Sequence, residues 1–112
     1  MRKGGISIDF DWKEYLNLAI ELSSVDEEAK LRSSISRAYY AAFCTARNYM
    51  VDHDHRIIPY DESVHQYVIS HYVGNKGSTK SKQRKKIAQE LKRMKIERQI
   101  ADYENNKRDL RQ

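Results

Sequence analysis

Apolar residues recur along this chain mostly at steps of three and four, the spacing that places side chains on one face of a helix. The pattern predicts four helices, over residues 11–22, 26–50, 61–73 and 81–104. The second segment is on the order of 36 Å long at about 1.5 Å per residue, enough to form the spine of a bundle. Its alanines, such as Ala38, Ala42 and Ala46, would let a neighbouring helix approach closely. The expected fold is all-α, an up-down four-helix bundle.

Residues at the predicted helix ends support these boundaries. Asp11, with Glu14 three residues later, fits a capping box at the start of the first helix. The acidic residues 26–28 suit the first turn of the second helix, because negative charge favours a helix N-terminus. Gly74 suits the position just past the end of the third helix.

The last predicted helix carries two apolar stripes. The first stripe consists of Ile87, Leu91, Met94 and Ala101. The second, adjacent stripe consists of Ile96, Ile100 and Tyr103. One stripe can face the core of this chain. The other would stay exposed, so we expect a dimer or another partner to cover it.

Composition indicates one helical domain over residues 1–112, with a core at about 10–104 and a polar tail at 105–112. A chain of 112 residues is too short for two domains that each bury a core. Four glycines and one proline are too few for an all-β protein, which needs turn residues about every ten positions.

The cysteine count and the hydropathy pattern suggest a compartment. Cys44 is the only cysteine, so no internal disulfide can form and a disulfide-stapled secreted fold is excluded. No apolar run approaches the roughly 18 residues of a membrane span, and residues 1–8 lack the apolar stretch of a secretory signal. We expect a soluble, cytoplasmic protein without membrane contact.

Positive charge is concentrated in the second half of the chain. The net charge is +5, and residues 56–112 carry fourteen Lys and Arg against seven Asp and Glu. The densest stretch is a basic segment at residues 76–98. Such a segment suits a phosphate backbone or an acidic protein, although a solvated helix face accounts for it equally well. The residues predicted to bind nucleic acid are Lys80, Lys82, Arg84, Lys85, Lys86, Lys92 and Arg93.

The first candidate catalytic set is Arg47 and Asn48 with His53. Arginine can stabilise charge on a phosphate and histidine can move a proton near neutral pH, which is what metal-free RNA cleavage requires. If the helix ran on through His53, the two side chains would point apart. Either the loop folds back or two subunits supply the groups. From the residue types and their spacing alone, an unrelated surface arginine and loop histidine are more common than a catalytic pair.

The alternative set is Arg98, Asp102 and Tyr103 in the last helix. Arg98 and Asp102 are four residues apart and can pair on the helix surface, which by residue chemistry alone favours a structural salt bridge beside an aromatic.

Metal and cofactor sites have little support. His53 and His55 lie beside Asp52 and Asp54, but a spacing of two aims the imidazoles apart on a helix. Cys44 lies in mid-helix and is expected to be a buried, inert thiol. No glycine-rich phosphate loop follows a strand. We therefore expect no metal and no cofactor.

Three segments together resemble the HEPN family of small α-helical domains from prokaryotic toxin–antitoxin, CRISPR-associated and other conflict systems. The second predicted helix contains Ser36-Arg37-Ala38-Tyr39-Tyr40-Ala41-Ala42-Phe43. His65 opens the third helix, and Arg98 to Tyr103 is similar to the Arg-x-x-Ala-Asp-Tyr signature of the fourth. Order and spacing agree over roughly residues 10–104.

This resemblance implies a helical bundle that dimerises through its long helices. Active members are metal-independent ribonucleases, in which Arg and His of two protomers meet at the dimer interface and a ribose 2′-OH attacks the adjacent phosphate. Here the usual position on the last long helix reads Arg98…Asp102-Tyr103 without histidine, and Arg47-Asn48…His53 spells the motif at the end of the second helix. Either the motif is displaced, or the domain is not a nuclease.

Three functions follow from these features. The first is a metal-independent endoribonuclease of a toxin–antitoxin or defence system, binding RNA and working with a cognate antitoxin or a nucleotidyltransferase-like partner. The second is a non-catalytic HEPN adaptor that binds nucleic acid, a nucleotide or a protein. The third is a dimerisation module of a larger complex.

Overall fold

The computed structural model describes residues 10–61, 63–74 and 79–105, with the backbone alone at residues 79 and 80. It contains helices α1 (Lys13–Ser23), α2 (Glu28–Asp52), α3 (Val64–Val73) and α4 (Thr79–Tyr103). The predicted all-α fold is confirmed, because all regular structure in the described ranges is helical. Residues 76–78 of the basic segment and 106–112 of the polar tail lie outside these ranges.

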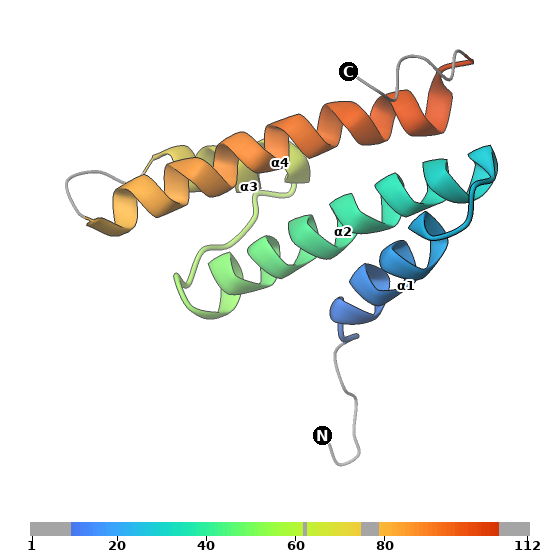
Figure 1. The fold of residues 1–112 in the computed structure, drawn as a ribbon. Coiled ribbons are helices and arrows are strands. Elements are labelled where there is room, and N and C mark those ends of the chain that lie inside the picture. Colours follow the sequence, from blue (N-terminus) through green and yellow to red (C-terminus); the bar gives the residue numbers. More distant parts are fainter. Residues whose placement is uncertain (1–9, 62, 75–78, 106–112) are drawn as a thin grey trace.

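The long helix α2 is the centre of the fold. α1 turns back along one side of it, and α4 runs antiparallel to it on the other side (Figure 1). The short helix α3 packs mainly on α4 and less on α2. This is a helical bundle, as the spacing predicts, with α2 as the predicted spine. None of the helices in the described part of the chain is both long and apolar enough to cross a membrane.

Local hydrogen bonds explain where the helices start and end. At α1, the Asp11 side chain accepts from the Lys13 amide at 3.0 Å, whereas the Glu14 amide bonds to the Asp11 backbone carbonyl at 2.9 Å. The predicted capping box is therefore only partly formed. At α3, Ser63 Oγ accepts from the Gln66 amide at 3.4 Å, so the helix starts three residues later than the pattern predicts.

The core lies where α2, α3 and α4 meet. Its fully buried large side chains are Tyr39, Met50 and Val68. From the first predicted stripe of α4, Leu91 and Ala101 are buried and Ile87 is partly exposed. From the second stripe, Ile96 and Tyr103 are 58% and 74% exposed. Within a single chain the second stripe is thus largely uncovered, as the sequence predicts.

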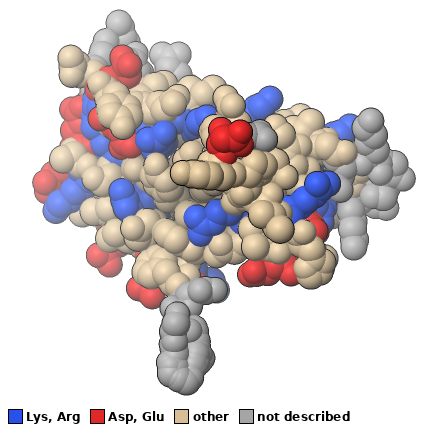
Figure 2. Space-filling view, turned by 180° about the vertical axis from the view of Figure 1, so that it is seen from behind, with Lys and Arg blue, Asp and Glu red and all other residues tan. Residues whose placement is uncertain are grey.

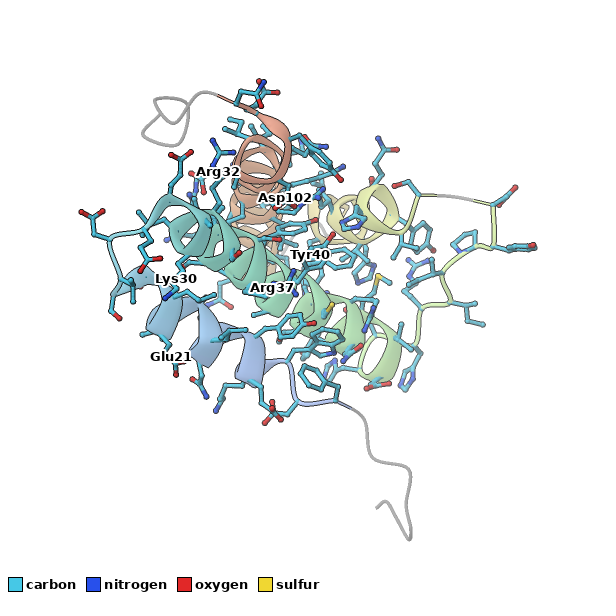
Figure 3. The ribbon with its side chains drawn as sticks, turned by 90° about the vertical axis from the view of Figure 1, so that its right-hand side faces the viewer. Glu21, Lys30, Arg32, Arg37, Tyr40 and Asp102 are labelled. Atoms are coloured by element: carbon cyan, nitrogen blue, oxygen red, sulfur yellow. The ribbon has the colours of Figure 1, made fainter. Side chains whose placement is uncertain are left out.

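Arg32 ties the start of α2 to the end of α4. Its Nη1 donates to the backbone carbonyls of Ala101, at 2.9 Å, and of Glu104. Its Nε donates to Glu28 at 2.9 Å. Because the last carbonyls of a helix have no partner within the helix and carry partial negative charge, a cation there stabilises the terminus. Figure 3 shows Arg32 beside the end of α4.

Candidate functional site

Arg47 and Asn48 form a local pair on α2. The Asn48 side-chain oxygen accepts from Arg47 Nε at 3.1 Å and from Nη2 at 3.0 Å. The guanidinium lies 5.8 Å from the centre of the Trp12 ring, next to the start of α1. The structure therefore places this predicted pair on the α1 side of α2.

His53 points away from Arg47. The helix continues to Asp52, and His53 keeps helical backbone angles, with its amide donating to the Tyr49 carbonyl at 2.8 Å. A separation of six residues turns a helix by about 600°, so the two side chains leave it in different directions. Across the described residues no hydrogen bond or ion pair joins Arg47 to His53. The loop does not fold back to bring them together.

His53 has different neighbours. Its ring stacks on Tyr49 with centroids 4.4 Å apart, and its Nδ1 lies 3.2 Å from Asp54 Oδ1. The side chain is 60% exposed. A carboxylate at Nδ1 favours the tautomer with the proton on Nδ1, which leaves the Nε2 lone pair free to accept a proton. His53 and Asp54 thus form a histidine–carboxylate pair in which the imidazole is exposed to solvent.

Asp54 also joins the loop to α3 and α4. Its carboxylate accepts two bonds from Arg84, at 2.6 and 3.1 Å, and lies 2.8 Å from His71 Nε2. The bonds from Arg84, and more weakly those from the two histidines, hold the pKa of Asp54 well below its usual range, although burial acts in the opposite direction. The same bonds raise the pKa of Arg84. We call Asp54, Arg84 and His71 the Asp54 clamp.

The Asp54 clamp brings together residues from two of the predicted sites. His53 is a predicted catalytic residue and Arg84 is a predicted nucleic-acid-binding residue, and both contact the same carboxylate. His55, with a φ of 56°, then turns the chain away in the left-handed region. The N-terminal half of α4 therefore lies next to His53.

The basic residues of α4 are not equally available to a ligand. Arg84 is largely buried in the Asp54 clamp. Arg93 is exposed but bonds to Glu90 at 2.7 Å and to Glu97 at 2.8 Å. Among the described residues no ion pair involves four exposed lysines, which are Lys82, Lys85, Lys86 and Lys92. The side chain of Lys80 lies outside the described residues.

On one face of the molecule the charges do not form a uniform patch. Figure 2, which shows the face opposite to that of Figure 1, has basic side chains interspersed with acidic and uncharged ones. On that face a phosphate backbone would therefore meet separate cations and not a broad positive surface.

The alternative predicted set forms a second polar cluster. Arg98 Nη1 donates to Asp102 at 3.3 Å, and Ser36 Oγ donates to the same carboxylate at 3.4 Å. The guanidinium lies over the rings of Tyr39 and Tyr40, 5.7 and 5.6 Å from their centres. The Arg98 side chain is only 12% exposed, whereas Tyr103 projects into solvent. Arg98 and Asp102 thus pair with each other and also contact side chains of α2.

His65 joins this cluster from the first turn of α3. Its Nδ1 lies 2.6 Å from the Tyr39 hydroxyl, and its ring stacks on Phe43 with centroids 4.2 Å apart. Burial, with smaller effects from the charges of Lys95 and Arg98, lowers the pKa of His65. Burial also raises the pKa of Tyr39 to about 12. At neutral pH both groups are therefore uncharged.

Sequence reasoning missed this histidine as a site residue. It treated the position of Arg98 as lacking a histidine because none lies nearby on the same helix. The available signal was the resemblance itself, since its three segments supply Tyr39, His65 and Arg98, and these three come together here.

A hollow of about 840 Å³ lies over one face of α2. Its floor includes Ala38 and Ala42, and its walls include Leu16 from α1 and Ile87 from α4. Both wall residues are more than one-third exposed. The alanine face predicted to accept a neighbouring helix is thus partly uncovered in the single chain. We call this hollow the α2 groove.

The described residues offer little for metal or thiol chemistry. No group of three or more His, Cys, Asp and Glu side chains in those ranges could hold a metal ion. Cys44 is buried, as expected, and burial raises the pKa of its thiol, which keeps it protonated.

No family model matches this chain, and no curated protein or solved structure matches it either. The resemblance to the HEPN family stays a prediction.

Proposed function

We propose that this chain is a HEPN-like, metal-independent endoribonuclease of a toxin–antitoxin or defence system, in which His53 moves the proton. One observation carries the proposal: His53, which is exposed, and Arg84, which belongs to the basic helix α4, contact the same carboxylate, Asp54. The proposed proton-transfer group therefore lies near the N-terminal half of α4, where the proposed phosphate contacts Lys85 and Lys86 are exposed.

In the proposed reaction, Asp54 holds the proton on His53 Nδ1, and Nε2 accepts the proton of a ribose 2′-OH. The resulting oxygen attacks the adjacent phosphate, which breaks the bond to the 5′-oxygen of the next nucleotide and leaves a 2′,3′-cyclic phosphate. The expelled 5′-oxygen takes a proton from water, and His53 returns its proton to solvent. Lys85 and Lys86, exposed close to Arg84 on α4, would hold the flanking phosphates. Arg84 itself is occupied by Asp54 and would act as a positioning residue.

A second copy of the chain would supply the cation that stabilises the phosphorane. Arg47 points away from His53 of its own chain, but each of them contacts an aromatic residue of the α2 groove. Arg47 lies over Trp12 and His53 stacks on Tyr49, and both aromatic residues line the groove. A homodimer that covers the exposed Leu16 and Ile87 would place Arg47 of one copy and His53 of the other at one interface.

The decisive experiment measures cleavage of single-stranded RNA by the purified protein in EDTA. We expect His53→Ala to lower the rate by about 10²- to 10⁴-fold, the usual contribution of general acid–base catalysis. His55→Asn is the matched control, because His55 is exposed and asparagine tolerates its positive φ. Equal rates for wild type and His53→Ala would refute the proposed role of His53.

A non-catalytic nucleic-acid adaptor is the second candidate. It is favoured by the four exposed lysines of α4, for which no ion pair is seen in the described ranges. This function requires salt-sensitive RNA binding without turnover. Wild-type protein that binds RNA but leaves it intact in EDTA would support the adaptor over the nuclease.

A further inference from the structure

The cluster around Arg98 takes no part in the reaction proposed above. Arg98 lies fourteen residues beyond Arg84 on α4, about 21 Å along the helix. It is enclosed by Tyr39 and Tyr40 of α2 and faces the junction with His65 of α3. We call this place the Arg98 junction. Its chemistry is distinct from that of His53.

The hydrogen-bonding capacity of Arg98 is not met by the protein. Its Nε is buried and is the one buried side-chain N or O in the described part of the chain that lacks a hydrogen-bond partner. Its bond to Asp102 is long, at 3.3 Å. A buried donor without a partner is costly, and in native proteins such a donor often contacts a bound ion or water.

Further donors at the Arg98 junction are also unused. Within the described residues no hydrogen bond or ion pair is seen at the Tyr40 hydroxyl, the Lys95 ammonium or the Nε2 of His65. With the Tyr39 hydroxyl donating to Nδ1 of His65, the proton of the neutral imidazole is on Nε2. Tyr40, His65 and Lys95 are all partly exposed. A ligand can therefore approach these groups from solvent.

The charge balance of the Arg98 junction favours an anion. Two cations lie on one face of α4 here, because Lys95 precedes Arg98 by three residues, and the charges of both lower the pKa of His65. Asp102 is the opposing carboxylate; it repels an anion but neutralises one cation at most, and Ser36 and Arg98 already bond to it. In Figure 3, Tyr40 and Asp102 lie between α2 and α4. A net positive, partly desolvated site of this kind attracts a phosphate group.

We propose that the Arg98 junction is a phosphate-binding site, separate from the His53 site, in which Arg98, Lys95, Tyr40 and the Nε2 of His65 contact the phosphate oxygens. The phosphate belongs either to a nucleoside monophosphate or to the backbone of RNA. The tyrosine rings under the guanidinium hold it in place and keep water from one side of it.

The test is a titration of the full chain followed by NMR of the histidine side chains. The probes are inorganic phosphate, AMP and a short single-stranded RNA without terminal phosphates. We expect a bound probe to shift the resonances of His65 and to raise its pKa, because the probe adds negative charge beside the imidazole. Response to AMP and phosphate alone identifies a monoester site, and response to the RNA identifies a backbone site.

Variants test whether Arg98 and Tyr40 contact the bound probe. Arg98→Gln should weaken binding of the responding probe by about tenfold or more, as expected for a lost charge-assisted hydrogen bond. Tyr40→Phe keeps the ring under Arg98 and should weaken binding by about three- to tenfold. Arg93→Gln is the matched control for phosphate and AMP, because Arg93 lies on the same helix and is also paired with carboxylates.

His53→Ala should leave this binding unchanged, so failure of the proposed nuclease and failure of this site are distinguishable. Circular dichroism verifies that Arg98→Gln is folded, and Tyr40→Phe tests the site if it is not. No response of His65 to any probe, or wild-type affinity in Tyr40→Phe and in folded Arg98→Gln, would overturn the proposal.

Discussion

At the scale of single residues, Asp54 contacts side chains from three helices or their ends. It bonds to Arg84 of α4 and contacts His71 of α3 and His53 at the end of α2. A largely buried carboxylate with these partners depends on them for its stabilising effect. Removing it leaves a buried guanidinium without its counter-charge.

We therefore expect Asp54→Asn to lower the free energy of unfolding by about 2–4 kcal/mol. Asp52→Asn is the matched control, since Asp52 is exposed two residues earlier, and surface substitutions usually change stability by less than about 0.5 kcal/mol. Urea denaturation measures both variants. Equal midpoints for the two variants would show that the Asp54 clamp contributes nothing to stability.

The difference in unfolding free energy between wild type and Asp54→Asn should depend on pH in one direction. The pKa of Asp54 is depressed in the folded state, mainly by the hydrogen bonds from Arg84, so ionised Asp54 favours folding. Its contribution is complete above the unfolded pKa of about 3.9 and is lost as pH falls below that value toward the folded pKa. The stability gap between wild type and Asp54→Asn should hold from pH 7 to about pH 5 and narrow below about pH 4. A gap that narrows already near neutral pH would contradict the depressed pKa.

At the scale of elements, α4 divides its basic residues into occupied and available ones. The sequence predicted seven phosphate-binding residues in this segment, and the structure gives Arg84 and Arg93 carboxylate partners within the protein. No sequence rule separates Arg84 from Lys85, because the partner of Arg84 lies thirty residues away in a loop. The exposed lysines remain the candidate contacts.

For this reason we expect Lys85→Gln with Lys86→Gln to weaken RNA binding. The salt dependence of log K should become shallower by about 1.4, since each phosphate contact contributes about 0.7 for a single strand. Arg93→Gln should have a smaller effect, because its charge is already paired. Fluorescence anisotropy at several salt concentrations measures the slopes. A slope identical to that of wild type in the double variant would exclude these lysines from the interface.

At the scale of the whole molecule, two of the apolar surfaces exposed by the described residues are available to a partner. One is the α2 groove, and the other is the stripe of α4 with Ile96 and Tyr103. The proposed homodimer uses the groove, because the neighbours of both Arg47 and His53 line it. If two copies share the cleavage site, two inactive variants should restore activity in a mixed dimer. A site within a single chain would not allow this.

We expect Arg47→Ala and His53→Ala to be inactive separately and to regain activity when the two variants are assembled together. In a two-fold dimer half of the assemblies are mixed, and each mixed dimer has one intact site. Activity should therefore return to about one quarter of the wild-type rate. RNA cleavage after co-expression measures this recovery. A mixture as inactive as its components would exclude a site shared between copies.

The four helices and their approximate ends followed from the sequence, because periodicity, caps and helix-ending residues act over a few neighbouring positions. The burial of Leu91, Ala101 and Cys44 followed from the same local pattern. The separation of Arg47 from His53 was left open by the sequence, which predicted a helix ending at residue 50. The structure decides it, because α2 continues to Asp52 and its turn angle directs the two side chains apart.

Only the tertiary structure decided which charged groups meet. Asp54 bonds to Arg84 and contacts His71, which belong to two other helices. Arg98 lies over the ring of Tyr40, and its charge acts on His65. Both sets form because separate helices pack side by side. Such pairings depend on distances between segments that are far apart in the chain, and spacing within one segment carries no information about them.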